Sequence, residues 1–195
     1  MSLILNDLLA LCAEAESAAD RYETASREAV RKLVAPKGKV DPALLEREQF
    51  AAHGFAWIAT YVAALRQMRR WAEAGHDGEL EKLILQSAFG EYLAQLKGGI
   101  AISQVEIVRP GDLGVDDTLL ETPAVARLIA ANTSAVRGRI AELIADGLET
   151  RGFGALGLDD EALEEVRRQV RRFGDCEVGP HAHGWHLRDE LIPLP

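Results

Sequence analysis

Apolar residues in the first hundred positions recur at alternating steps of three and four, which is the period of an amphipathic α-helix. The first apolar stripe consists of Leu8, Cys12, Ala15, Ala19, Tyr22, Ser26, Ala29 and Leu33. Pro36 and Gly38 follow this stripe and are residues that end helices. The pattern predicts one long helix over residues 3–34.

Two further long helices are predicted over residues 42–74 and 79–107. Asp41 and Pro42 supply an N-cap and a first helical residue, and the segment 75–78 separates the two helices. The second stripe is Phe50, Gly54, Trp57, Tyr61, Leu65 and Met68, and the third is Leu80, Ile84, Ala88, Tyr92 and Leu96 with Leu85, Phe89 and Leu93 beside it. We expect a bundle of these helices whose core buries Trp57, Tyr61, Leu65, Phe89 and Leu93.

Gly54 and Gly90 lie inside these helical patterns. A glycine inside a helix costs about 1 kcal/mol relative to alanine. Two interpretations stand side by side: another helix or a ligand approaches closely at these positions, or the glycines are merely tolerated there.

Shorter helices are predicted in the second half of the chain. A turn is expected at 109–112, and helix starts are expected at Thr122-Pro123 and at Thr133 or Ser134. Asp159 is the expected cap of a last helix, which has acidic residues near its start and arginines near its end.

Gly152, Gly154 and Gly157 mark the clearest boundary in the sequence. They divide it into a helical domain at 1–151, a Gly-rich linker at 152–158 and a last segment at 159–195. Because no run of alternating apolar and polar residues indicates a strand, the predicted fold class is all-α, an antiparallel helical bundle.

Composition excludes several classes of function. The 195 residues carry a net charge of −9, which disfavours nucleic-acid binding. The four arginines at 167–168 and 171–172 are interpreted as a solvated helix face. Two distant cysteines, Cys12 and Cys176, without a secretory signal or a membrane-spanning apolar run, indicate a cytoplasmic protein with reduced thiols.

Residues that carry chemistry are few. Neither cysteine has the sequence context of a nucleophile, and no pair of carboxylates stands out as acid and base. His183, His186 and Glu190 would share one face of a continuous helix, and two imidazoles with a carboxylate are able to bind a transition metal. Packing or solvent exposure of these residues is the favoured interpretation. No catalytic, cofactor-binding or metal-binding residue is therefore assigned.

Residues 159–193 resemble the first helices of the acyl-CoA dehydrogenases. The similarity is carried by Arg171, Phe173, Val178 and Pro180, and by the run His186-Leu187-x-Asp189-Glu190-Leu191-Ile192-Pro193. Upstream, the runs at 46–57, 60–62, 64–68, 90–96, 98–100 and 103–110 resemble the N-terminal extension of the methylsuccinyl-CoA dehydrogenase subgroup. The resemblance covers essentially the whole chain.

This resemblance implies a part of an FAD-dependent enzyme that oxidises methylsuccinyl-CoA to mesaconyl-CoA in the ethylmalonyl-CoA pathway. It also implies that the family's flavin-binding β-domain, and the helical domain with its glutamate base, lie beyond Pro195. We therefore expect this chain alone to bind no flavin and to be inactive. Its expected partners are the missing dehydrogenase core and further copies of itself. The alternatives are a stand-alone helical interaction module and, less favoured, a metal-binding helical protein.

Overall fold

The computed structural model describes residues 2–148, 156–157 and 160–191. The chain forms two compact units, Met1–Ala155 and Leu156–Pro195, and each is described here by itself. Most of the predicted linker at 152–158 lies outside the described residues, as does the predicted cap Asp159.

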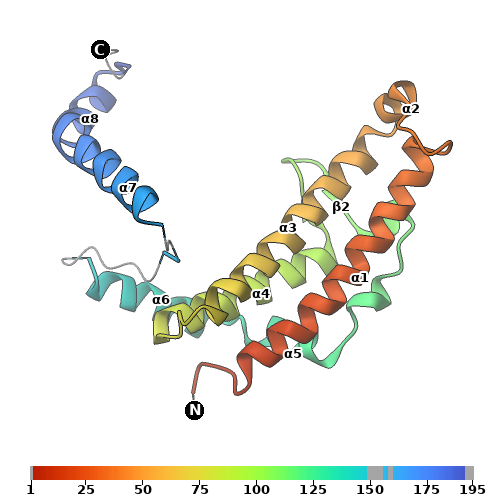
Figure 1. Ribbon diagram of the computed structural model, residues 1–195, viewed down its shortest axis with the longest axis horizontal. Coiled ribbons are helices and arrows are strands. Elements are labelled where there is room, and N and C mark those ends of the chain that lie inside the picture. The colour runs from red at the N-terminus through yellow and green to blue at the C-terminus, as the bar shows by residue number, and fades with distance from the viewer. Residues whose placement is uncertain (1, 149–155, 158–159, 192–195) are drawn as a thin grey trace. The chain divides into compact units, whose positions relative to one another are not determined.

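The first unit is an antiparallel helical bundle. Its helices are α1 (Leu8–Val34), α2 (Pro42–Arg47), α3 (Gln49–Glu73), α4 (Glu79–Gly98), α5 (Pro123–Ala131) and α6 (Ser134–Asp146), with the 3₁₀ turns η1 (Pro110–Leu113) and η2 (Asp117–Leu120). Figure 1 shows α1, α3 and α4 side by side and alternating in direction. The all-α fold class is confirmed.

Three helix starts follow the predicted capping chemistry. The Asp41 carboxylate accepts hydrogen bonds from the backbone N–H groups of Ala43 and Leu44, at 2.9 and 3.3 Å. Thr122 caps α5 and Thr133 caps α6 through their hydroxyl oxygens. Each cap satisfies backbone N–H groups that have no partner within the helix.

Other boundaries differ from the prediction. The helix expected at 3–34 begins only at Leu8, because the side chain of Gln86 binds the backbone of Leu3 and Leu5 and holds residues 3–5 out of the helix. The helix expected at 42–74 is interrupted at Glu48, which lies between α2 and α3.

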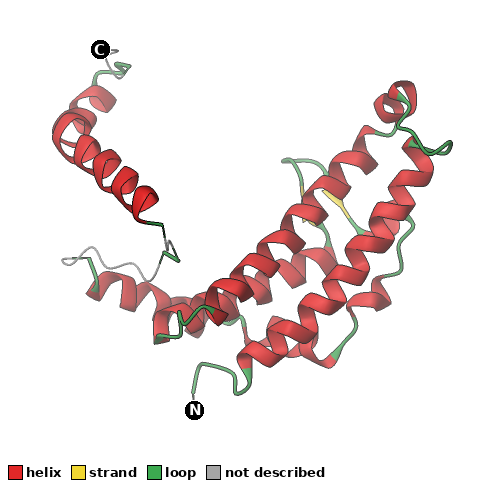
Figure 2. Cartoon of the chain, in the orientation of Figure 1, coloured by secondary structure: helices red, strands yellow, loops and turns green. Residues whose placement is uncertain are grey.

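The helix expected at 79–107 ends at Gly98, and the prediction of no strand is wrong beyond it. Gly99 has φ +122°, a conformation that glycine adopts readily. The chain then forms a short antiparallel hairpin of β1 (Ile100–Ala101) and β2 (Ile107–Val108), with Ile100 opposite Val108. This hairpin contains the only strands in the described part of the chain (Figure 2).

The buried face of α3 is turned by about one residue from the predicted stripe. Leu65 is buried as predicted, but Trp57 and Tyr61 are only half-buried, and Phe50 is 39% exposed. Ile58 and Val62 are buried in their place. On α4, Phe89 and Leu93 are both fully buried, as predicted.

The stripe of α1 changes in its last two turns. Six of its eight predicted members are buried, but Ala29 is half-buried and Leu33 is 39% exposed. Val30 and Val34 enter the core at that end.

Both internal glycines allow close packing. The first interpretation is confirmed at Gly90, where helix α5 approaches, whereas the close neighbour of Gly54 is the hairpin and not a helix or a ligand. A Cβ atom at Gly54 would lie 2.5 Å from Cγ2 of Val108, which brings the hairpin onto α3. A Cβ atom at Gly90 would lie 2.5 Å from Cβ of Asn132 and 2.7 Å from the carbonyl oxygen of Leu128. At both positions the neighbour is another segment of this chain.

The second unit consists of α7 (Glu161–Phe173), the π-helical turn η3 (Gly174–Val178) and α8 (Gly179–Leu187). Asp160 caps α7 by accepting from the backbone N–H groups of Ala162 and Leu163. Gly184 lies inside α8, and Pro180 stands in the first turn of that helix. None of these elements contains a buried residue.

Candidate interaction surface

A group of ion pairs joins α1 to α3 in the bundle. Glu16 is bound by Arg69, with 2.6 Å between its carboxylate and Nε, and Arg69 also pairs with Glu73. Glu23 and Asp20 are bound together by Arg66. The hydrogen bonding that Arg69 donates to the Glu16 carboxylate is the main cause that raises the pKa of Arg69. The carboxylates of Glu16, Asp20 and Glu23 on α1 are thus bound by arginines of α3 and join the two helices.

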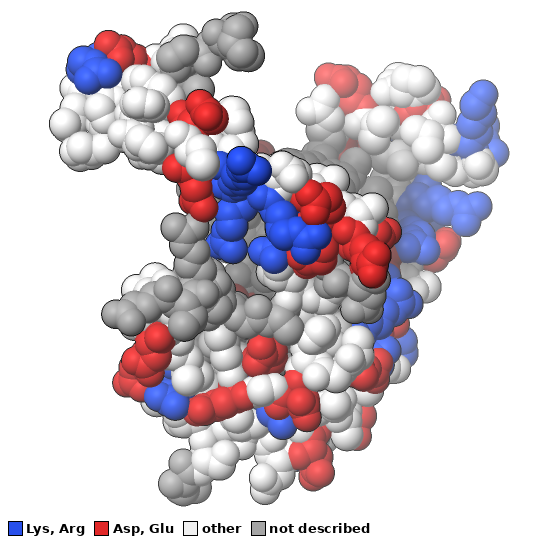
Figure 3. Space-filling view, turned by 60° about the vertical axis from the view of Figure 1, so that its left-hand side comes forward, with Lys and Arg blue, Asp and Glu red and all other residues white. Residues whose placement is uncertain are grey.

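The arginines of the second unit pair with neighbouring acids. Arg167 pairs with Glu164, and Arg168 pairs with Glu165. Their helix α7 is exposed along its length. On the face of the molecule in Figure 3, acidic and basic side chains lie next to one another. The interpretation of these arginines as a solvated helix face is therefore confirmed.

The hypothetical metal ligands do not meet. Helix α8 ends at Leu187, so Glu190 does not continue the face that carries His183 and His186. Glu190 instead pairs with Arg188 at 2.8 Å. Within residues 2–148 and 160–191, no three His, Cys, Asp or Glu side chains form a group that could hold a metal ion.

The two cysteines lie in different environments. Cys12 is fully buried in the bundle core, and burial raises the pKa of its thiol to about 12. Cys176 is exposed in the second unit. Both are free thiols.

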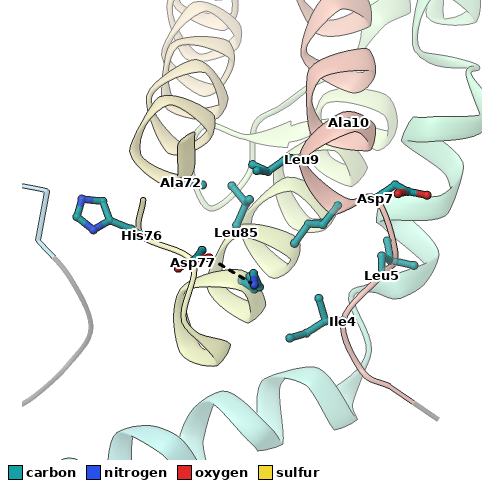
Figure 4. A pocket seen from close by; sticks show the side chains of 11 residues that line it. Ile4, Leu5, Asp7, Leu9, Ala10, Ala72, His76, Asp77 and Leu85 are labelled. Carbon is teal, nitrogen blue, oxygen red and sulfur yellow. Dashed lines mark ion pairs between the residues drawn. The ribbon is translucent and has the colours of Figure 1, made fainter. Parts of the chain in front are cut away.

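A cavity of about 330 Å³ lies at the end of the bundle where α1 begins and α3 ends. In Figure 4 the apolar side chains of Ile4, Leu9 and Leu85 surround it, and the Asp7 carboxylate points away. Lys82 also lines the cavity and pairs with Asp77 at 4.0 Å. The cavity is mainly apolar and is bounded on one side by the N-terminal segment that Gln86 holds.

A ladder of aromatic rings covers one face of α3 and reaches α4. We call Phe50, His53, Trp57, Tyr61 and Tyr92 the aromatic face. The rings of Tyr61 and Tyr92 are stacked with centroids 4.5 Å apart, and Trp57 meets Tyr61 edge-on at 6.1 Å. His53 continues the ladder, with its ring centroid 6.3 Å from that of Trp57.

Hydrogen bonds fix the polar atoms of this ladder. The Trp57 indole N–H donates to Nε2 of His53 at 3.0 Å, and the Tyr61 hydroxyl donates to the Gln95 side-chain oxygen at 2.8 Å. Gln95 in turn donates to Glu91. Partial burial raises the pKa of Tyr61 above its ordinary value.

A groove of about 260 Å³ extends the aromatic face at the start of α3. Phe50 and His53 line one side, and Ile102 and Glu106 of the hairpin line the other. Leu45, which is 39% exposed, also lines the groove, and Ile107, which is 42% exposed, follows Glu106 in the chain.

Sequence reasoning placed Trp57 and Tyr61 in the core, with Phe50 on the same apolar stripe, and so missed this surface. The available signal was a second stripe that shares Gly54 and Leu65 with the first but takes Ala51, Ile58 and Val62, one position further along, in place of the aromatic residues. That stripe leaves His53 and Thr60 on the same side as the aromatic residues. Polar residues between large aromatic ones indicate an edge of the buried face.

The described helices include none that is long and apolar enough to cross a membrane. No protein-family model matches the chain. A curated protein, the (2S)-methylsuccinyl-CoA dehydrogenase of Cereibacter sphaeroides, is 51% identical to it over 198 residues. The match covers 98% of this chain and 35% of that enzyme, so the chain spans about a third of its relative's length. The resemblance seen in the sequence runs is thereby confirmed, and the chain is related to the (2S)-methylsuccinyl-CoA dehydrogenases.

Proposed function

We propose that this chain is a helical part of an FAD-dependent acyl-CoA dehydrogenase that converts methylsuccinyl-CoA to mesaconyl-CoA. The observation that carries the proposal is the 51% identity to (2S)-methylsuccinyl-CoA dehydrogenase over 98% of the chain. At that identity, and over that length, the two segments share one fold. The chain would then be one structural part of a cytoplasmic enzyme with the same activity as that relative.

The proposed division of labour leaves the chemistry to the dehydrogenase core. An acyl-CoA dehydrogenase removes a proton with a carboxylate while the flavin accepts a hydride, and both groups must stand within a few ångströms of the substrate. The buried carboxylates among residues 2–148 are Glu16 and Glu23, and both are bound by arginines between α1 and α3. Their role in joining helices supports a structural function for the first unit.

The second unit supports a partnership with a core. Leu163, Val166, Val170 and Phe173 form one apolar stripe of α7, and each is between 52% and 64% exposed. A helix of this length gains most of its stability from packing an apolar stripe against a neighbour. We propose that the rest of the enzyme's helical domain covers this stripe.

A stand-alone helical interaction module is the second candidate. One observation favours it: the first unit has its own closed core, extending from Leu8 to Leu128, together with an ordered aromatic face. On this alternative the chain would bind another protein without taking part in a dehydrogenase.

Flavin content and activity separate the two candidates. The purified chain is expected to be colourless and inactive with methylsuccinyl-CoA and an electron acceptor. A chimaera, in which this chain replaces the matching part of the C. sphaeroides enzyme, is expected to retain flavin and activity. A yellow, active chain would place the flavin site within these residues. A chimaera no better than the enzyme lacking the segment would favour the stand-alone module.

A further inference from the structure

The aromatic face is built as a contact surface rather than as leftover core. Trp57, Tyr61 and Tyr92 are half-buried, so each residue packs against the core and keeps part of its surface exposed to solvent. Their ring contacts and the hydrogen bonds to His53 and Gln95 hold them in one arrangement. Rings fixed in advance lose little conformational entropy on binding, and aromatic residues dominate the energetic centres of protein interfaces.

The outer side of α1 provides a contrast. Its exposed positions include Glu14, Ser17, Arg21, Glu28 and Arg31, which are polar or charged. Arg21 donates to Ser17, and Arg31 pairs with Glu28, so this side is satisfied by its own neighbours and by water. The bundle therefore has a solvent-adapted side on α1 and an aromatic face on α3 and α4.

The groove beside Phe50 lengthens the aromatic face, and a carboxylate lies at each end of the combined surface. Glu106 of the hairpin lines the groove, and Glu91 accepts hydrogen bonds from Gln95 and Asn132 beside Tyr92. A complementary surface would present apolar side chains to the rings and basic groups towards the two carboxylates.

We propose that the aromatic face and its groove are the surface on which this helical unit packs against the dehydrogenase core. This inference rests on the proposed function, and it identifies the surface of the first unit that contacts the core. The match accounts for only 35% of the relative's length, so most of that enzyme lies outside the segment and is available as the partner. The runs 46–57, 60–62 and 90–96, which are among those that carried the resemblance, also contain every residue of the aromatic face.

Cysteine labelling in the chimaera tests this surface directly. Phe50 and Leu33 are each 39% exposed, and one lies on the aromatic face while the other lies on α1. Phe50→Cys and Leu33→Cys therefore form a matched pair. Alkylation at each position is quantified by peptide mass spectrometry, first in the isolated chain and then in the chimaera with the C. sphaeroides core.

Cys at position 50 is expected to react at least about tenfold more slowly in the chimaera than in the isolated chain, because a buried thiol is shielded from the reagent. Cys at position 33 is expected to react equally in both. In addition, Trp57→Gln should lower the temperature at which the chimaera releases flavin, while leaving the melting temperature of the isolated chain within a few degrees.

Three results would overturn the inference. Equal alkylation at position 50 in both proteins would show that the core does not cover the aromatic face. Protection at position 50 that rises with the concentration of the isolated chain would assign the face to a second copy of this chain. Loss of flavin from the unsubstituted chimaera would reject the proposed function, and the inference would fall with it.

Discussion

Single residues decide the packing of the bundle at a few close contacts. Gly90 is the clearest case, because the atoms close to its missing Cβ include a backbone oxygen, that of Leu128 at 2.7 Å. A backbone atom cannot rotate away as a flexible side chain does. The close approach of α4 and α5 therefore depends on the absence of a side chain at this position.

Gly90→Ala should destabilise the protein although alanine is the better helix former. The gain in helix propensity is about 1 kcal/mol, and overpacking costs typically about 1–3 kcal/mol, so the free energy of unfolding should fall. Gly138→Ala in α6 is the matched control, because nothing lies within 4 Å of its Cβ position, and it should be neutral or stabilising. Urea unfolding measures both. Stabilisation by both substitutions would contradict the close contact.

Buried titratable residues make stability fall at high pH. Burial raises the pKa of Cys12 from 9.0 to about 12 and that of Tyr22 from 10.0 to about 12. Between these values the unfolded chain releases protons that the folded chain retains, so the free energy of unfolding decreases from about pH 9 to pH 12. Tyr22→Phe should flatten this decrease above pH 10. Urea unfolding at several pH values measures it, and an unchanged slope would contradict the assignment.

At the scale of elements, the ion pairs between α1 and α3 fix how these two helices lie against each other. The Glu16 side chain is 8% exposed and Arg69 is 22% exposed, so neither charge is well hydrated. Removing one partner leaves the other without compensation, which costs more than the pair itself contributes.

Arg69→Met should lower the free energy of unfolding by about 1–3 kcal/mol, less than for a fully buried pair because Arg69 is partly exposed. Adding Glu16→Gln should restore part of the loss, since the unpaired charge is then removed. Arg21→Met, on the exposed side of α1, is the control and should change the value by at most about 0.5 kcal/mol. Chemical denaturation gives all three values. Equal effects of Arg69→Met and Arg21→Met would argue against the bridge.

The sequence predicted those element boundaries that depend on interactions between residues close together in the chain, and missed those that depend on distant residues. Caps such as Asp41, Thr122 and Thr133 act on the next three residues, so local chemistry predicted them. The late start of α1 depends on Gln86, more than 80 positions away, and no local pattern reveals it. The hairpin has only two residues in each strand, too few for an alternating pattern.

The interaction surface was hidden for a similar reason. One residue of a helix corresponds to about 100° of rotation. In α3 the predicted stripe and the stripe through Ile58 and Val62 are both largely apolar, so the apolar pattern alone does not decide which of them faces the core. Packing against Val108 at Gly54 selects Ile58 and Val62 for the core, and leaves Trp57 and Tyr61 at its edge. That choice depends on the hairpin, which the sequence did not predict.

For the whole molecule, the two units differ in how much of their apolar surface they bury. Every member of the core cluster lies between Leu8 and Leu128 in the first unit. In the second unit, described over 156–157 and 160–191, the large apolar side chains remain open, with Leu187 71% exposed and Leu191 91% exposed. Trp185 is half-buried, and Ile192 lies outside the described residues. These exposures predict unequal stability of the two units within one chain.

Amide hydrogen exchange and a truncated chain should both reveal that inequality. Amides of Val166–Phe173 should exchange much faster than those of Leu85–Leu93, because a short helix without buried side chains opens easily in water. A fragment of residues 1–148 should keep the melting temperature of the full chain within a few degrees, since it retains the entire core cluster. Equal protection of α7 and α4 would show that the second unit is a self-sufficient domain. A large drop in the melting temperature of the fragment would show that residues 149–195 support the bundle, contrary to the separation of units.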